Sequence, residues 1–425
     1  MEDITQVSGQ VTQLAYALDT FYFLVMGALV MWMAAGFTML ESGLVRAKNT
    51  AEILTKNVGL YAIACIMYML CGYSLMYPGD YTGGVFQSLS TLGTGLLGSA
   101  DNDVATVMAG DAYYSNLSDF FFQVVFVATA MSIVSGAVAE RMKLWSFFLF
   151  AVVLTGFIYP VQGFWKWGGG FLNEMGFLDF AGSGVVHLCG AAAALAGVLL
   201  LGARKGKYGP GGQVNAIPGC NLPLAALGTL ILWLGWFGFN GGSELKVSDV
   251  GEANAVALVF VNTNMAAAGG LVFALLLSRL WFGKADLTMA LNGALAGLVA
   301  ITAEPLTPTP LAATLIGAVG GVIVIGSIVL MDKIKVDDPV GAISVHGVVG
   351  MWGLIAVCFT NPDAKLGVQL IGLITIFAWV FITSGIVWYV IKLIMGLRVT
   401  EEEEYEGVDL SECGLEAYPE FKPAD

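Results

Sequence analysis

Charged residues are scarce in this chain. They make up 12% of its 425 residues and hydrophobic residues make up 57%, whereas soluble domains carry roughly 25% charge. Only two histidines occur, and the six cysteines include no Cys-x-x-Cys pair. These shortages exclude an ordinary soluble domain, a disulfide framework and a Cys/His zinc site. We predict no cofactor, no catalytic residue of an enzyme and no nucleic-acid partner.

Long apolar runs are abundant instead. Eleven stretches, most of them 18 residues or longer, could cross the ~30 Å hydrocarbon core as helices of about 20 residues. The sequence therefore predicts an all-α polytopic membrane protein with eleven transmembrane helices. The expected spans are 21–40, 57–77, 118–138, 144–163, 182–202, 219–240, 254–278, 288–303, 311–331, 340–360 and 366–391. Residues 1–20 contain three acids and no Lys or Arg, so they do not resemble a signal peptide.

Basic residues fall almost entirely on alternate connections between these spans. One side receives 15 of the 18 Lys and Arg, and the other receives only Lys166, Lys246 and Lys365. The positive-inside rule then places the N-terminus outside the cell membrane and the C-terminus in the cytoplasm. An odd number of spans also requires that the two termini lie on opposite sides of the membrane.

The segment after Arg398 is strongly acidic, unlike the rest of the chain. It contains ten acidic residues against Lys422, which accounts for −9 of the net charge of −14. We expect a transmembrane domain over residues 1–398 and an acidic cytoplasmic tail over 399–425. Such a tail is either a solvated terminus or a regulatory segment that packs on the basic loops or binds a partner.

A nine-residue pattern occurs twice. Residues 179–187 and 338–346 both run from Asp to His, with Gly at the third place after Asp and Val at the seventh. Five spans separate the copies, so one runs inwards and the other outwards. This predicts an inverted-topology repeat of spans 1–5 and 6–10, with the eleventh helix as an addition.

The two histidines of this pattern should lie close together. Eight helical residues at about 1.5 Å each place His187 and His346 ~12 Å below opposite faces of the membrane core, so their depths differ by only about 6 Å. Such a pair can share a proton. Packing alone is the alternative, but intramembrane ionisable residues are functional by default. Ser183 and His187, four residues apart, would also fit an intramembrane hydrolase.

Several motifs together resemble the ammonium transporter family, the Amt/Mep/Rh proteins. The first is residues 36–49, which read GFTMLESGLVRAKN. The others follow in family order at residues 122–126, 136–141, 167–170, 179–187, 236–243 and 337–350. The presence of Trp167 and Ser243 favours the microbial and plant Amt branch.

The resemblance implies a homotrimer whose protomers each contain a pore. It assigns Phe126, Trp167 and Ser243 to an outer ammonium site that Asp179 organises. It assigns Phe126 and Phe239 to a gate. It assigns His187, His346, Trp236 and Gln123 to the pore lining below and beside that gate. It also implies a PII-type signalling protein as a possible partner at the cytoplasmic face.

The residue types suit this chemistry. Aromatic faces and one hydroxyl attract a small cation without a fixed charge that would trap it. Past the gate, a deprotonated species would avoid most of the cost of moving a charge through an apolar pore. An ammonium sensor that signals through its tail is the alternative function. The sequence leaves open whether ammonia, ammonia plus a proton, or the intact cation crosses.

Overall fold

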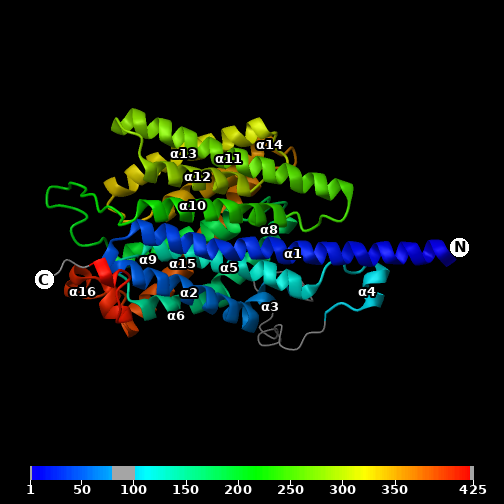
Figure 1. Ribbon diagram of the computed structural model, residues 1–425, viewed down its shortest axis with the longest axis horizontal. Helices are drawn as coiled ribbons and strands as arrows, with labels where there is room; N and C mark the ends of the chain where they lie inside the picture. Colours follow the sequence, from blue (N-terminus) through cyan, green and yellow to red (C-terminus); the bar gives the residue numbers. More distant parts are fainter. Residues whose placement is uncertain (1, 79–100, 422–425) are drawn as a thin grey trace.

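The computed structural model describes residues 2–78 and 101–421, and within these ranges the chain is helical and has no β-strand. Its α-helices are α1 (Glu2–Leu44), α2 (Thr50–Met67), α3 (Tyr73–Met76), α4 (Val104–Ala109), α5 (Asn116–Ala137), α6 (Leu144–Val153), α7 (Tyr159–Lys166), α8 (Phe171–Glu174), α9 (Cys189–Leu201), α10 (Leu222–Trp236), α11 (Val250–Phe282), α12 (Leu287–Thr302), α13 (Pro310–Lys333), α14 (Val349–Thr360), α15 (Leu366–Ile394) and α16 (Glu401–Glu406). The long helices lie side by side along the long axis of the molecule (Figure 1).

Ten helical segments in the described ranges are long and apolar enough to cross a membrane. The predicted all-α polytopic membrane fold is therefore confirmed. Each of the eleven expected spans coincides with helix. The eighth, expected at 288–303, is α12, and its 16 residues are fewer than the about 20 of a typical span.

Helix α1 is much longer than the expected first span. It begins at Glu2 rather than near Phe21 and runs for 43 residues, so its first half projects beyond the bundle (Figure 1). Residues 2–20 contain no proline and a single glycine, and nothing in them breaks a helix. Hydropathy detects only the part of a helix that meets lipid, which explains the difference.

Five of the spans contain a π-helical turn: η2 (Tyr68–Gly72), η4 (Leu154–Ile158), η5 (Ser183–Leu188), η6 (Phe237–Gly241) and η7 (Ile343–Val348). Such turns widen a helix by one residue and are frequent at functional sites. No sequence pattern predicted them. Two of them, η5 and η7, carry the two histidines.

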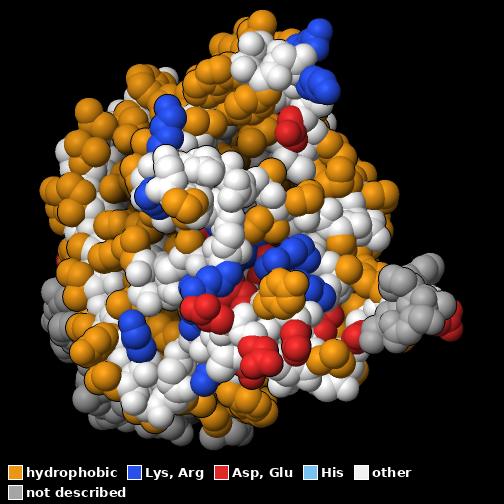
Figure 2. Space-filling model, turned by 90° about the vertical axis from the view of Figure 1, so that its left-hand side faces the viewer, with side chains coloured by type: hydrophobic (Ala, Val, Ile, Leu, Met, Phe, Trp, Pro, Cys, Tyr) orange, Lys and Arg blue, Asp and Glu red, His pale blue; other side chains and the backbone are white. Residues whose placement is uncertain are grey.

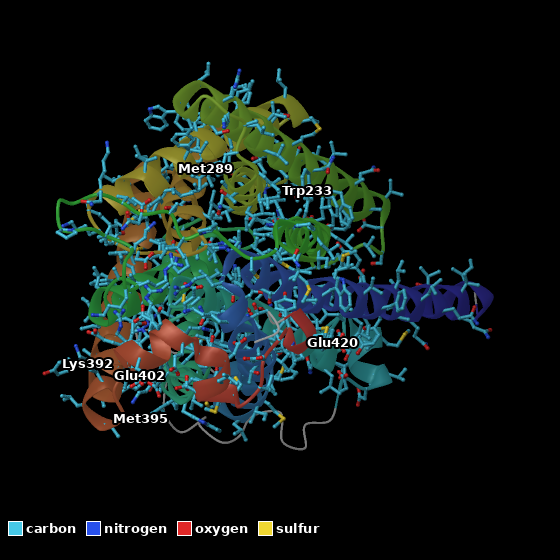
Figure 3. All side chains as sticks on the ribbon, turned by 60° about the vertical axis from the view of Figure 1, so that its left-hand side comes forward. Trp233, Met289, Lys392, Met395, Glu402 and Glu420 are labelled. Atoms are coloured by element: carbon cyan, nitrogen blue, oxygen red, sulfur yellow. The ribbon has the colours of Figure 1, made fainter. Side chains whose placement is uncertain are left out.

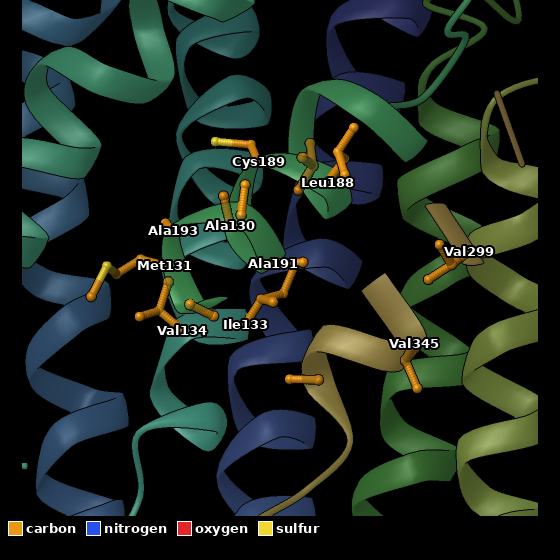
Figure 4. Close-up of a cluster of buried hydrophobic side chains, with 14 of the residues drawn as sticks. Ala130, Met131, Ile133, Val134, Leu188, Cys189, Ala191, Ala193, Val299 and Val345 are labelled. Carbon is orange, nitrogen blue, oxygen red and sulfur yellow. The ribbon is translucent and has the colours of Figure 1, made fainter. Parts of the chain in front are cut away.

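The interior of the bundle contains many small and aliphatic side chains beside its buried aromatic rings. Figure 4 shows one such cluster, in which Ala130 and Ile133 of α5 face Ala191 of α9, with Val299 of α12 and Val345 of η7 nearby. Glycine allows the closest approaches: a Cβ on Gly317 of α13 would lie 2.0 Å from the carbonyl oxygen of Ala266 in α11. Small residues thus permit the close helix packing on which membrane bundles depend.

The acidic tail folds back onto one end of the bundle, which we call the tail end; the opposite end is the far end. Glu402 of α16 lies at the same end as Lys392 of α15 and Met395, which follows that helix (Figure 3). Glu404 is 2% exposed and forms an ion pair with Arg398 at 2.7 Å. The described part of the tail is therefore packed against the bundle.

Two further tail carboxylates bind backbone groups of the bundle. Asp409 accepts a hydrogen bond of 2.8 Å from the backbone N–H of Glu52, in the first turn of α2. Glu412 accepts one of 2.8 Å from the backbone N–H of Leu144, the first residue of α6. Carboxylates at helix N-termini satisfy free N–H groups and suit the helix dipole. The described part of the tail is therefore packed on the bundle, and its regulatory role stays a prediction.

A buried ionic network lies beneath the tail. Arg204 binds Asp337 and Glu140, each at 2.9 Å, and Arg46 binds Glu140 at 3.0 Å. Charged side chains gather in the middle of the tail-end face, with hydrophobic side chains around them (Figure 2). Burial by itself would raise the pKa of Glu140 and of Asp337, but the neighbouring arginines outweigh it and lower both to about 2. Both carboxylates are therefore ionised at neutral pH.

Candidate functional site

The two copies of the repeated pattern have similar structures. The Asp179 carboxylate accepts hydrogen bonds from the backbone N–H groups of Gly184 and Val185, at 3.0 and 2.9 Å. The Asp338 carboxylate likewise accepts bonds from the N–H groups of residues 341 and 343, at 3.1 and 2.7 Å. Each acid thus holds the start of the π-helical turn that carries a histidine. Asp179 acts here as a helix cap, and burial raises its pKa to about 6.

The histidines meet in the centre of the bundle. Nδ1 of His187 lies 3.2 Å from Nδ1 of His346, and the two rings are stacked with centroids 5.1 Å apart. One Nδ1 must donate and the other accept, so the pair holds a single proton between these atoms. The other ring nitrogen of His187, Nε2, is buried and has no hydrogen-bond partner among the described residues.

A column of rings leads from this pair towards the far end. The ring of His187 is 5.3 Å from that of Phe239, which is 4.1 Å from that of Phe126. The ring of Trp167 then lies 6.0 Å from Phe126 in an edge-to-face arrangement. His187 also stacks on Trp236 at 5.1 Å, and the ring of Trp236 lies 5.8 Å from that of Phe239. Phe126 and Phe239 are both buried, so their paired rings close the column.

Above the rings, a pocket of about 430 Å³ opens at the far end, which we call the far-end pocket. Its walls combine seven aromatic side chains with a few polar ones: Tyr73, Tyr77, Tyr114, Phe122, Phe126, Trp167, Phe180, Asp119, Gln123, Lys166, Asn173, Ser243 and Leu245. Gln123 therefore lies in this pocket, above the ring pair rather than beside the histidines.

The predicted site residues in the pocket are held by backbone contacts. The indole Nε1–H of Trp167 donates to the carbonyl oxygen of Asp179 at 3.1 Å. The Ser243 hydroxyl donates to the carbonyl oxygen of Phe239 at 2.8 Å, so its lone pairs remain able to accept a hydrogen bond. The structure thus brings Phe126, Trp167 and Ser243 together around one cavity, with Asp179 behind Trp167.

Sequence reasoning missed two charged residues of this pocket, Lys166 and Asp119. Asp119 is the acidic one. Its carboxylate is 7% exposed, accepts a hydrogen bond of 2.6 Å from the Tyr73 hydroxyl, and lies 3.4 Å from Nε2 of Gln123. A signal existed, because Asp119, Gln123 and Phe126 follow the spacing of one helix face. An acid within an apolar span would have identified that face as functional.

The hydrolase interpretation lacks the contact that it needs. The Ser183 hydroxyl donates to the carbonyl oxygen of Val299 at 2.7 Å, whereas His187 faces His346. No hydrogen bond joins Ser183 to His187 in the described part of the chain, so a nucleophile and its base are not paired. Nor do the described residues contain a group of three or more His, Cys, Asp or Glu that could hold a metal ion.

Comparison with known proteins places the chain in one family. The model of the Ammonium Transporter Family matches residues 21–418. The chain is 41% identical to Ammonium transporter Amt2 of Archaeoglobus fulgidus, over 95% of this chain and 89% of that protein. It is 37% identical to Ammonium transporter Amt1 of Haloferax mediterranei, over 96% of this chain and 80% of that protein.

Solved structures agree with the sequence matches. A protein described as Sensor Amt Protein has a TM-score of 0.85 and 35% identity, covering 94% of this chain and 99% of its own. Mep2 of Candida albicans has a TM-score of 0.80 and 26% identity, covering 97% and 94%. With relatives above 30% identity over nearly its whole length, and with paired histidines beneath a pocket of aromatic rings, this chain belongs to the ammonium transporter family.

Proposed function

We propose that ammonium enters this protein at the far-end pocket, passes between Phe126 and Phe239, and continues along the histidine pair to the tail end. The observation that carries this proposal is the buried Nε2 of His187, which has no partner among the described residues. A buried polar atom without a partner is costly, and ammonia or ammonium at this position would supply the missing hydrogen bond. The species that crosses is ammonia, with or without a proton.

Recruitment is proposed at Phe126, Trp167 and Ser243. The rings of Trp167 and Phe126 both line the pocket and meet edge to face, and aromatic faces attract cations. The Ser243 hydroxyl can accept an N–H of ammonium, which a metal cation does not offer. Asp179 contributes by holding the indole of Trp167, without contact with the ion.

Transport itself can be tested in reconstituted membranes. A jump in ammonium concentration should evoke a current or an internal pH change in proteoliposomes that contain the protein, and an equal potassium jump should evoke neither. The control is protein-free liposomes prepared alongside. Equal responses to ammonium and potassium, or none to ammonium, would contradict the proposed function.

Trp167→Leu should weaken recruitment while leaving the fold intact. The indole provides cation–π attraction on the order of 1–2 kcal/mol at a desolvated site, so the ammonium concentration for half-maximal transport should rise about tenfold. A matched control is Trp281→Leu, because Trp281 lies on α11 and is 55% exposed. Unchanged concentration dependence and selectivity in Trp167→Leu would remove this side chain from the mechanism.

The arrangement in the membrane is proposed to follow the repeat. Eleven spans, with α12 as the eighth, give two inverted halves of five helices and one additional helix. The matching carboxylate bonds of Asp179 and Asp338 at the starts of η5 and η7 support this assignment. In the cell membrane, the far end and the N-terminus then face outwards, and the tail end faces the cytoplasm.

The assembly is proposed to be a homotrimer, with a transmembrane domain over residues 1–398 and a regulatory cytoplasmic tail over 399–425. The packing of Asp409 on α2 and of Glu412 on α6 supports regulation. A PII-type signalling protein is the proposed partner at the cytoplasmic face, where three-fold symmetry would match a trimer.

Truncation after Arg398 should change transport, because it removes the carboxylates that bind the first turns of α2 and α6. The expected result is altered ammonium flux, loss of inhibition by the cell's PII protein, or both. Truncation after Phe421 is the matched control, since it removes only four residues. Wild-type flux together with a wild-type response to the PII protein in the longer truncation would show that the tail has no regulatory role.

A second candidate function is ammonium sensing. It is favoured by the likeness to the solved protein described as Sensor Amt Protein, and here the signal would pass through the packed tail. The two functions differ in flux: a protein that senses without transporting should bind ammonium and change the exposure of its tail to protease, but should carry no ammonium in liposomes.

A further inference from the structure

A carboxylate that the proposed pathway does not use lies inside the bundle. Glu41, near the end of α1, is 1% exposed. Its Oε2 accepts hydrogen bonds from Nδ2 of Asn57 at 2.8 Å and from the hydroxyl of Ser135 at 2.7 Å. Both donors are neutral. Asn57 belongs to α2 and Ser135 to α5, so the carboxylate lies where three spans meet.

Glu41 has no ion-pair partner within the described residues. The nearby Lys56 forms its ion pair with Glu52 at 3.2 Å, and no Lys, Arg or His in the described ranges forms an ion pair with Glu41. An acid that lies inside a membrane span without a basic partner is expensive, and such residues usually serve a pathway for ions or protons.

Glu41 shares a small cavity with the second histidine. The cavity measures about 20 Å³ and its lining is mainly apolar, with Glu41, Ser132, Asn292 and His346 as its polar residues. A cavity of more than ~10–15 Å³ can hold a water molecule where polar groups are there to bind it, and here Glu41 and His346 are such groups. One water molecule in this cavity would therefore lie between a ring of the histidine pair and the carboxylate.

The same cavity adjoins a larger pocket at the tail end. Asn292 and Val340 line it and also line a larger pocket of about 450 Å³. That larger pocket reaches Asp286, Asp338 and Lys207 at the tail end. Glu41 and His346 thus line a cavity that adjoins the larger pocket.

We propose that Glu41 is the proton acceptor on the tail-end side of the histidine pair; this rests on the proposed function. Ammonium gives a proton to a ring nitrogen of the pair, and its N–H bond breaks as a ring N–H bond forms. His346 then passes one proton to the water in the cavity, which passes one to the Glu41 carboxylate. The products are neutral ammonia and a carboxylic acid, which regenerates its carboxylate by releasing the proton into the larger pocket.

Glu41→Gln tests this proposal, because glutamine keeps the shape and the hydrogen-bonding oxygen but cannot take up a proton. The measurement is the ammonium-evoked current together with the uptake of ¹⁵N-labelled ammonium in the same proteoliposomes. The expected result is a fall of at least tenfold in the charge carried per nitrogen. A purely structural defect would lower current and uptake together and leave their ratio unchanged.

Two further variants keep the test decisive. Ser135→Ala removes a hydrogen bond to the same oxygen but leaves the carboxylate, so its ratio should remain within twofold of wild type. Glu41→Asp keeps a carboxylate and should retain a measurable current even if Glu41→Gln does not assemble. A wild-type ratio in Glu41→Gln, or no current in an assembled Glu41→Asp that still takes up nitrogen, would overturn the proposal.

The result can be separated from that of the proposed function. If wild-type protein gives neither current nor uptake, then transport itself fails. If wild-type protein gives both and Glu41→Gln matches its ratio, then only the role of Glu41 fails.

Discussion

His346→Ala should abolish the ammonium-evoked current or open the pore to potassium, while the protein still assembles. Nδ1 of His346 is the hydrogen-bond partner of Nδ1 of His187 at 3.2 Å. Loss of either ring leaves its partner unpaired in a buried site, which costs about 1–3 kcal/mol, and removes a step of any proton relay. The two histidines act as a unit, so we expect the same outcome for His187→Ala.

The measurement is ammonium and potassium current side by side in reconstituted membranes, with assembly checked by size-exclusion chromatography. The double variant should be no worse than the sum of the single variants, because residues that act as a unit have non-additive effects. Val345→Ala is a matched control: Val345 precedes His346 in η7 and is buried, so its loss leaves a void but removes no nitrogen. Wild-type current and continued exclusion of potassium in both single histidine variants would show that the pair serves packing only.

Arg204→Met should be the most destabilising substitution at the tail end, with a loss of ~3–5 kcal/mol. Arg204 is 4% exposed and binds both Asp337 and Glu140. Methionine retains part of its aliphatic volume but leaves two buried carboxylates with one cation fewer. The midpoint of thermal unfolding, followed by size-exclusion chromatography of heated samples in detergent, measures the loss.

Lys205→Met is the matched control, since it removes a positive charge from the adjacent residue. Lys205 pairs with Glu401 at the surface, where the two side chains are 55% and 80% exposed, and such pairs contribute little. Its unfolding midpoint should therefore stay close to wild type. Equal midpoints for the Arg204 variant and the Lys205 variant would contradict a stabilising role of the buried network.

The same network predicts how stability depends on pH. The pKa values of Glu140 and Asp337 lie near 2 in the folded protein, below the roughly 4 of carboxyl groups in unfolded chains. Their contribution is therefore complete above about pH 5 and is lost as the pH falls towards 2. Wild-type protein should lose thermal stability over this range more steeply than Arg204→Met, in which both carboxylates have lost a cationic partner.

Local composition decided much of the architecture. Lipid accepts only segments that satisfy their own backbone hydrogen bonds, so each expected apolar stretch could only be helix, and helix is found at every one. The repeated Asp-to-His pattern also determined its local structure, because the same residues at the same spacing form the same cap before η5 and η7. The length of α1 was not predicted, because residues 2–20 are helical but lack the high hydropathy of a membrane span.

Contacts between distant segments escaped prediction for another reason. Asp119 meets Tyr73 across 46 positions, and Asp409 meets Glu52 across 357. Which face of a helix meets which neighbour depends on how small residues such as Gly317 allow the bundle to pack, and no local pattern records that choice.

The sequence by itself determined the membrane fold, the family motifs and the two histidines, because hydropathy, spacing and residue type act locally along the chain. Only the tertiary structure decided that Nδ1 of His187 faces Nδ1 of His346, that Asp119 lines the far-end pocket, and that Glu41 shares a cavity with His346. These are contacts between different spans. They form only when the helices pack closely and bring together side chains that are distant in the sequence.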